Sequence, residues 1–173
     1  MKGDIGFGWN PFLPGRVYSD RMKDWLPWAP LVAAILHMTE EFVYPGGFAA
    51  WYRRYRVEAS RITPRFLVII NGALLVACVN LALLGRTLPG AVYWLTIATL
   101  MCSNGIWHAW ASYRSGGYSP GVLTGMMIYV PLTVYGYTEF LRSGVVPIYV
   151  ALTAGIVGGS YQLWSALYHK RRR

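Results

Sequence analysis

Apolar residues dominate long segments of this chain, and short clusters of charged residues separate them. Four segments contain no Asp, Glu, Lys or Arg: 66–85, 87–113, 115–138 and 143–168. Each is long enough to cross a bilayer as a helix, which takes about 20 mainly apolar residues. A soluble core of this size would not need four such segments. The pattern therefore predicts an all-α fold, as a polytopic bundle of membrane helices.

We predict five transmembrane helices, at Leu26–Tyr44, Phe66–Leu84, Ala91–Tyr113, Val122–Leu141 and Val145–Tyr168. The first is short and carries three ionisable residues, so a re-entrant course is an alternative to a full crossing. It ends at Pro45-Gly46-Gly47, a strong helix breaker.

The rest of the chain is assigned around these helices. Residues 1–25 are predicted to form an amino-terminal segment outside the membrane, and 26–168 a single transmembrane bundle. Within the bundle, 46–62 mixes Trp and Tyr with Arg, which is typical of a segment lying at the level of the lipid headgroups. The basic residues in 169–173 are predicted to form a tail that binds anionic headgroups.

The amino-acid composition excludes several classes of protein. Hydrophobic residues make up 55% of the 173 residues and charged residues 13%, about half the usual charged share. This excludes disorder, a coiled coil and most soluble enzymes. The net charge of +9 comes from clusters beside the predicted helices, so it indicates membrane topology and no nucleic-acid partner. The positive-inside rule predicts an integral protein of the cell inner membrane with its carboxyl terminus in the cytoplasm.

Ionisable side chains stand out inside two of the predicted helices. His37, Glu40 and Glu41 are three and four residues apart, which puts both carboxylates on the His37 side of the first helix. Asn104 and His108 are four apart on one face of the third helix. Such groups are costly inside a membrane and usually mark a functional site. Polar contacts that only hold helices together are the alternative, but amides and hydroxyls would do this at a lower desolvation cost.

Depth places these groups in one layer. With a rise of 1.5 Å per residue, all five helices place polar groups in the cytoplasmic half of the bundle, and Asn80 is the main exception. We therefore predict one site that opens towards the inner leaflet. Its catalytic residues are predicted to be His37, Glu40, Glu41, Asn104 and His108. Its substrate-binding residues are predicted to be Tyr44, Asn71, Trp107, Trp110, Thr124, Tyr129 and Tyr161.

Several short motifs carry a resemblance. The sequence HMTEE at 37–41 followed by PGGF at 45–48 resembles the small integral membrane proteins named for their HXXEE motif. NxxxH at 104–108 and YSPGxxT at 118–124 are also similar to that family, and the likeness covers roughly 28–147. It implies a helical membrane fold with a shared polar site, and it supplies no reaction. A looser likeness to emopamil-binding-type sterol isomerases rests on architecture and residue types.

The leading hypothesis is an enzyme that transfers protons on an apolar, lipid-like or isoprenoid substrate without a cofactor. Burial and a neighbouring carboxylate both favour the neutral form of a carboxyl group. One of Glu40 and Glu41 is then expected to act as general acid, and the other, paired with His37 or His108, as base. The Trp107 and Trp110 faces would stabilise a carbocation. Isomerisation, cyclisation or hydration fits this set of groups.

Two alternatives remain open at this point. His37, Glu41 and His108 offer two imidazoles and a carboxylate, which suit zinc or non-haem iron in a membrane hydrolase or oxidase. The other alternative is a proton-coupled carrier, because intramembrane carboxylates and histidines commonly relay protons.

Overall fold

The computed structural model describes residues 25–43, 46–55 and 63–170, and this part of the chain is helical with short connections. Its elements are η2 (Leu26–Trp28), α1 (Ala29–Val43), α2 (Phe48–Tyr55), α3 (Pro64–Leu84), α4 (Leu88–Ser115), α5 (Val122–Thr124), the π-helix η3 (Gly125–Tyr129), α6 (Val130–Arg142) and α7 (Ile148–Lys170). The predicted all-α class is confirmed.

The apolar pattern located the helices closely. Each of the five predicted helices matches an observed helix, or a continuous run of helices, and their ends differ by a few residues. Within 46–62, residues 48–55 form α2. Of the predicted amino-terminal segment, 1–24 lie outside the described residues, as do 171–173 of the predicted tail. Residues 169 and 170 belong to α7.

Local sequence explains where the long helices begin and end. Thr63 caps α3 by accepting a hydrogen bond from the Phe66 N–H, and Thr87 caps α4 in the same way through Gly90. Gly116 follows α4 with a φ of 64°, a left-handed conformation that glycine adopts without steric cost. These caps fix where α4 begins and ends, and so where Asn104 and His108 lie along the bundle.

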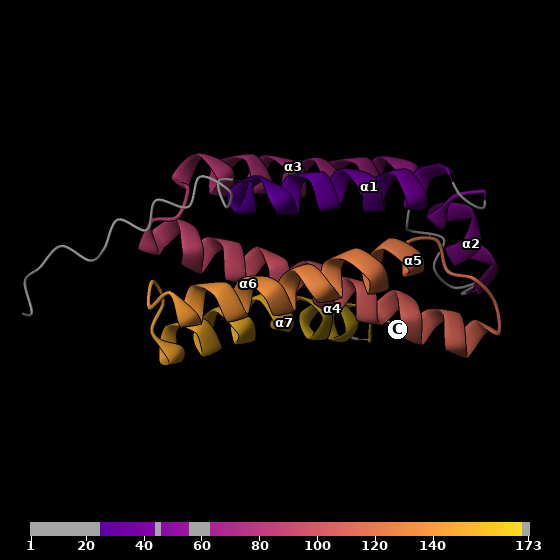
Figure 1. The fold of residues 1–173 in the computed structure, drawn as a ribbon. Helices are drawn as coiled ribbons and strands as arrows, with labels where there is room; N and C mark the ends of the chain where they lie inside the picture. Colours follow the sequence, from indigo (N-terminus) through magenta and orange to yellow (C-terminus); the bar gives the residue numbers. More distant parts are fainter. Residues whose placement is uncertain (1–24, 44–45, 56–62, 171–173) are drawn as a thin grey trace, which may run out of the picture.

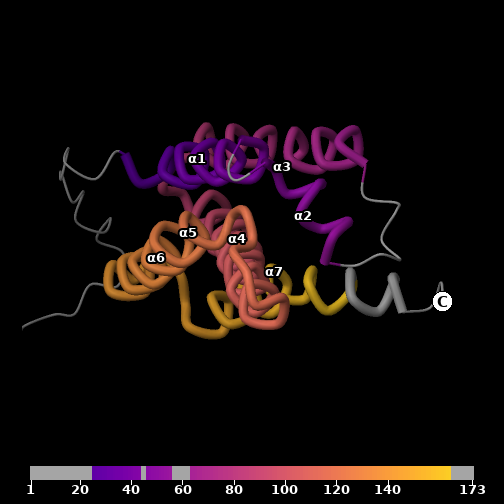
Figure 2. The backbone as a smooth tube through the Cα atoms, turned by 90° about the vertical axis from the view of Figure 1, so that its right-hand side faces the viewer, coloured from indigo at the N-terminus to yellow at the C-terminus, as the bar shows by residue number. Residues whose placement is uncertain are grey.

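The helices form two layers. In Figures 1 and 2, α1 and α3 lie side by side in one layer, and α4, α6 and α7 form the other. The helix α4 packs against α3, α6 and α7, and the short α2 crosses one end of the bundle. The polar residues of α1 and α4 therefore meet between the layers.

Glycines allow the closest helix contacts. A β-carbon added to Gly105 of α4 would lie 2.8 Å from the Cα of Gly125, so the backbones of α4 and η3 touch here. A β-carbon on Gly136 would overlap the ring of Trp94, which is buried and donates its indole N–H to the Leu26 carbonyl. These contacts hold α4 close against η3 and α6.

One described helix supports the prediction of a membrane protein, and the five crossings remain a prediction. Among the described helices, α3 is long and apolar enough to cross a bilayer, with a mean hydropathy of 2.5 in its best window. One such helix is weak evidence for membrane association. The other helices do not meet this measure: α1 has 15 residues, for example, and the run from α5 to α6 is divided by the π-helix.

Candidate functional site

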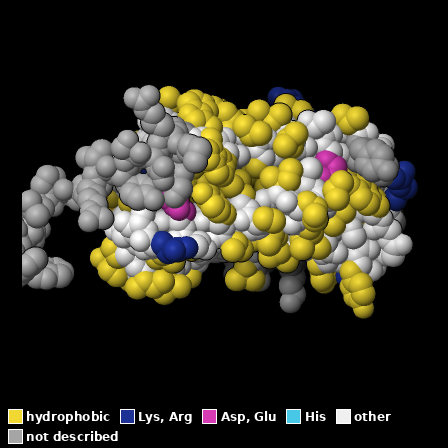
Figure 3. Space-filling view, in the orientation of Figure 1, with side chains coloured by type: hydrophobic (Ala, Val, Ile, Leu, Met, Phe, Trp, Pro, Cys, Tyr) yellow, Lys and Arg dark blue, Asp and Glu magenta, His cyan; other side chains and the backbone are white. Residues whose placement is uncertain are grey.

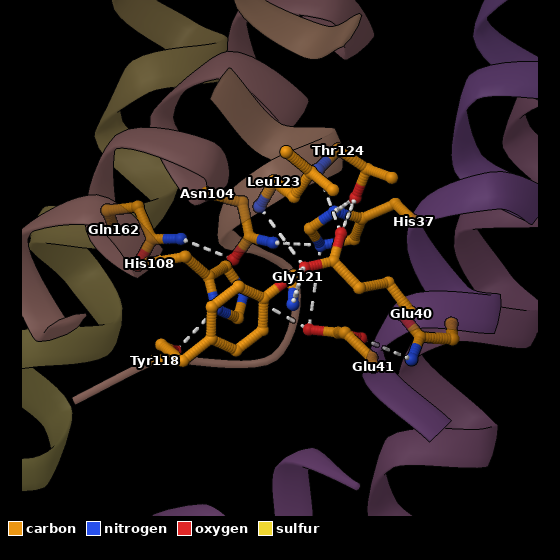
Figure 4. Close-up of polar contacts among 12 residues, drawn as sticks. His37, Glu40, Glu41, Asn104, His108, Tyr118, Gly121, Leu123, Thr124 and Gln162 are labelled. Carbon is orange, nitrogen blue, oxygen red and sulfur yellow. Dashed lines mark hydrogen bonds and ion pairs between the residues drawn. The ribbon is translucent and has the colours of Figure 1, made fainter. Parts of the chain in front are cut away.

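Two buried histidines and two buried glutamates meet between the layers. His37, Glu40 and Glu41 project from α1 towards His108 of α4, as Figure 4 shows. The His37 and His108 rings are 5.2 Å apart between centroids, and their side chains are 3% and 1% exposed. Both carboxylates are also buried. The ionisable side chains of the first and third predicted helices thus face each other rather than the outside of the bundle.

Both imidazoles direct Nε2 to the same carboxylate oxygen. His108 Nε2 lies 3.1 Å from Glu41 Oε1, and His37 Nε2 lies 3.6 Å from it. The other oxygen, Oε2, accepts a hydrogen bond of 3.3 Å from the Asn71 side chain of α3. Glu41 therefore lies at the meeting point of α1, α3 and α4.

A chain of hydrogen bonds fixes the orientation of His37. The Thr124 hydroxyl donates to Glu40 Oε2, so its oxygen is left to accept from His37 Nδ1 at 2.9 Å. With its proton on Nδ1, His37 keeps a lone pair on Nε2, and Asn104 donates to that atom at 3.1 Å. Gln162 of α7 donates to the Asn104 carbonyl, which turns the Asn104 amide nitrogen towards His37. Nε2 is thus the acceptor nitrogen of this ring.

The second imidazole is held in a similar way. His108 Nδ1 bonds to the Ser119 hydroxyl at 3.0 Å, and Ser112 accepts a hydrogen bond from the Ser119 backbone N–H. The rings of Phe48 and Trp107 pack around it, with centroids 5.2 and 5.1 Å away. The α2 helix and its aromatic residues thus cover the His108 side of the site.

Glu40 has a different environment from its neighbour. It accepts hydrogen bonds from the backbone N–H groups of Gly121, Leu123 and Thr124, at 2.8, 3.1 and 2.8 Å. The hydroxyls of Tyr118 and Thr124 also donate to it. Backbone amides only donate, so this set suits an ionised carboxylate. Glu40 satisfies the free N–H groups where α5 begins, as a capping residue does, but from another helix.

Gly121 lies against the His37 and His108 rings and covers one side of the site. Its φ of +99° is rare for residues with a side chain, and a β-carbon there would lie 2.8 Å from His37 Cε1 and 2.9 Å from His108 Cε1. The loop 118–121 can reach both imidazoles only because this position has no side chain. Its N–H then points to Glu40.

Most of the predicted site residues meet here, and some do not. The structure brings together His37, Glu40, Glu41, Asn71, Asn104, Trp107, His108, Thr124 and Tyr129. Trp110 is 47% exposed on α4, and Tyr161 is half-buried on α7, one residue before Gln162. Tyr44 lies outside the described residues.

Other residues of the site were not predicted. They are Tyr118, Ser119 and Gly121 in the loop before α5, together with Gln162. The loop carries a sequence signal, the YSPG run, but nothing in its spacing indicates that it folds back over α1. Tyr129 packs its ring on His37 at 4.5 Å, and its buried hydroxyl has no hydrogen-bond partner among the described residues.

His37, Glu41 and His108 lie close enough together to hold a metal ion. One ligand atom from each lies within 4.8 Å of the other two. Two ligands bound 2.0–2.1 Å from a tetrahedral ion lie about 3.3 Å apart. The two distances to Glu41 Oε1, 3.1 and 3.6 Å, lie on either side of that value. The far nitrogen of each ring is bonded to a hydroxyl, as the far nitrogens of metal-bound histidines are bonded to a neighbouring group.

Comparison with known proteins gives one match. No curated protein and no solved structure matches the chain. A family model described as "Protein of unknown function with HXXEE motif" matches residues 28–136, which include the site residues from α1, α3, α4 and α5. The chain therefore belongs to the HXXEE-motif family.

Proposed function

We propose that this chain is an integral membrane protein that crosses the bilayer five times. In support, large apolar side chains on α3 and α7 face outwards, among them Val68, Ile69, Leu83, Leu152 and Ile156. Apolar side chains also cover much of the face in Figure 3. Exposed apolar surface of this extent favours contact with lipid. Proposed with it are the inner membrane as location and a cytoplasmic carboxyl terminus.

We further propose that the protein is a metal-dependent membrane enzyme acting on an apolar, lipid-like substrate. His37, Glu41 and His108 would hold one divalent ion, zinc or ferrous iron. The observation that carries the proposal is the convergence of both Nε2 atoms on Glu41 Oε1, with each Nδ1 already bonded to a hydroxyl. Three protein ligands leave an open position for water or substrate, as in catalytic zinc sites.

Each neighbouring group has a role in this proposal. An ion with an open position would polarise a carbonyl group or lower the pKa of a bound water. Thr124 and Ser119 hold the two imidazoles with Nε2 towards Glu41 Oε1, where the ion would bind. Asn71 orients the Glu41 carboxylate. Asn104 would give up its hydrogen bond to His37 Nε2 when the ion takes that lone pair. Burial of the set keeps bulk water away.

The test is metal analysis of purified protein by mass spectrometry. We expect close to one zinc or iron per chain, and loss of at least nine-tenths of it in His108→Ala and in Glu41→Gln. Glu139→Gln is the matched control, because it makes the same change in a carboxylate that pairs with Arg86 at another place. An equal metal content in Glu41→Gln and Glu139→Gln would contradict the proposed centre.

Metal-free acid–base chemistry is a second candidate for the same site. The observation in its favour is the position of Glu41 Oε1 between two imidazoles, which allows a proton to pass between carboxylate and ring. Isomerisation, cyclisation or hydration of an isoprenoid would then need no cofactor. A protein that turns over a lipid substrate at full rate in the presence of a strong chelator would favour this candidate.

A further inference from the structure

An apolar groove lies between α1 and α6. It has a volume of about 340 Å³, and the residues lining it are Trp25, Trp28, Ala29, Val32, Ala33, Leu36, Ile128 and Leu132. Sites for small molecules have volumes of about 300–1,000 Å³. The side chains that line the groove are apolar throughout, apart from the two indole N–H groups.

The groove has two defined ends. At one end Trp25 stacks on Tyr135 of α6, with ring centroids 5.7 Å apart. At the other end α1 packs on α5 and η3, and in Figure 1 the α1 and α6 ribbons converge towards α5. From Ala29 to Leu36 the α1 wall is about 10 Å long, at 1.5 Å per residue.

The converging end lies next to residues that precede or follow the polar site in the sequence. Leu36 of the groove precedes His37, and Ile128 lies one turn after Thr124, which bonds His37 and Glu40. Between them, the Tyr129 ring lies against the His37 imidazole, and its buried hydroxyl has no partner among the described side chains. A molecule that fills the groove would have one end beside the turn of α1 that carries His37, with the Tyr129 ring packed on that imidazole.

We propose that the groove holds the hydrocarbon chain of the substrate. The substrate is then a lipid with its reacting polar group at the end of a straight or isoprenoid chain. Assigning this chain to the substrate, rather than to any other lipid, rests on the proposed function of the polar site. A peptide or a sugar would leave hydrogen-bonding groups unsatisfied against apolar walls, whereas a hydrocarbon chain has none to satisfy.

The experiment uses a palmitic acid probe with a diazirine in mid-chain, added to the full chain in lipid nanodiscs. After illumination, mass spectrometry maps the labelled peptides. We expect label on α1 between 28 and 36 and on η3–α6 between 128 and 132, and competition by unlabelled palmitic acid. Label spread evenly over the outer faces of α1, α3 and α7, without competition, would overturn the proposal.

Matched variants separate the groove from ordinary lipid contact. Ala29→Phe with Val32→Phe fills the groove and should lower the label at least fivefold. Ala73→Phe with Val76→Phe makes the same changes at the same spacing on exposed positions of α3, and should leave the label unchanged. An equal effect of the two pairs would overturn the proposal.

A second variant is needed in case the protein with the filled groove does not fold. Leu36→Ala with Leu132→Ala widens the groove and should raise labelling by a branched isoprenoid acid probe at least threefold. No gain in labelling would count against the groove. Metal content is measured on the same samples, so a protein that binds the chain but no metal would contradict the proposed centre and leave the groove assigned.

Discussion

Glu40 and Glu41 are adjacent in the sequence, but we expect their substitution by glutamine to have different consequences. Both changes keep the size of the side chain and remove its charge. Glu40 accepts hydrogen bonds from three backbone N–H groups at the start of α5. Glu41 instead faces two imidazoles and Asn71. The first glutamate is thus a positioning residue, and the second belongs to the proposed metal centre.

The loss of stability expected for Glu40→Gln follows from the groups that donate hydrogen bonds to this side chain. The single amide oxygen can still accept from Gly121 and Leu123, which share Oε1, but the amide nitrogen then faces the Thr124 N–H. One buried donor without an acceptor costs about 1–3 kcal/mol. For a chain of this length, each kcal/mol shifts the unfolding temperature by about 2–4 °C. We therefore expect a decrease of roughly 2–12 °C, with a smaller loss of metal than in Glu41→Gln.

Glu41→Gln should give the opposite pattern. In the metal-free protein an amide can still accept from Asn71 and bond an imidazole, so the free energy of unfolding should change by about 1 kcal/mol or less. The negatively charged ligand is lost, however, and with it the bound metal. We expect an unfolding temperature close to that of the unsubstituted protein in chelator, and no stabilisation when zinc is added.

The assay is thermal unfolding in detergent, with chelator and with added zinc, together with metal analysis of the same samples. The reasoning is refuted if Glu40→Gln loses its metal while its unfolding temperature in chelator is unchanged. It is also refuted if Glu41→Gln retains metal. Glu139→Gln reports what the same chemical change does at a carboxylate outside the site.

Three further predictions concern the surroundings of the site. Tyr129→Phe removes a buried hydroxyl without a described partner and should stabilise the metal-free protein by about 1–3 kcal/mol in thermal unfolding, so a clear loss of stability would contradict the assignment. Gly121→Ala introduces a β-carbon at 2.8–3.0 Å from both imidazoles, so it should destabilise the protein by about 1–3 kcal/mol and lower its metal content. Gly117→Ala, with open space around it, is the control and should have neither effect. Arg86→Ala breaks a partly exposed ion pair with Glu139 and should cost less than about 1 kcal/mol, and a larger shift in unfolding temperature would show a structural role for that pair.

The helices and half of the site follow from local sequence. Uncharged segments between breakers locate α3, α4 and α7, because apolar runs of this length are too long for a strand and favour a helix. Helical spacing places Asn104 and His108 on one face of their helix. The rise per residue brings Asn71 and Thr124 to the same level of the bundle as these two residues. These are short-range relations, and they need no knowledge of how the helices pack.

The remaining half depends on packing that the spacing does not contain. Trp107 and Trp110 are three apart on α4, but Trp107 contacts His108 and Trp110 is exposed, because α2 covers one of them and not the other. Tyr118 and Ser119 reach the site only because Gly121 allows the loop to turn back over the imidazoles. A loop contact between distant segments is fixed by the neighbouring helices, so local patterns do not predict it.

Helical geometry also explains why the motif has two adjacent glutamates. At 3.6 residues per turn, a residue three positions after His37 points about 60° to one side of it, and a residue four positions after it about 40° to the other side. Glu40 is thereby turned towards the start of α5, and Glu41 towards α3 and α4. Glu40 also reaches His37 indirectly, because Thr124 bonds both of them and sets the proton on Nδ1. The first glutamate of the motif thus prepares the imidazole with which the second one shares the site.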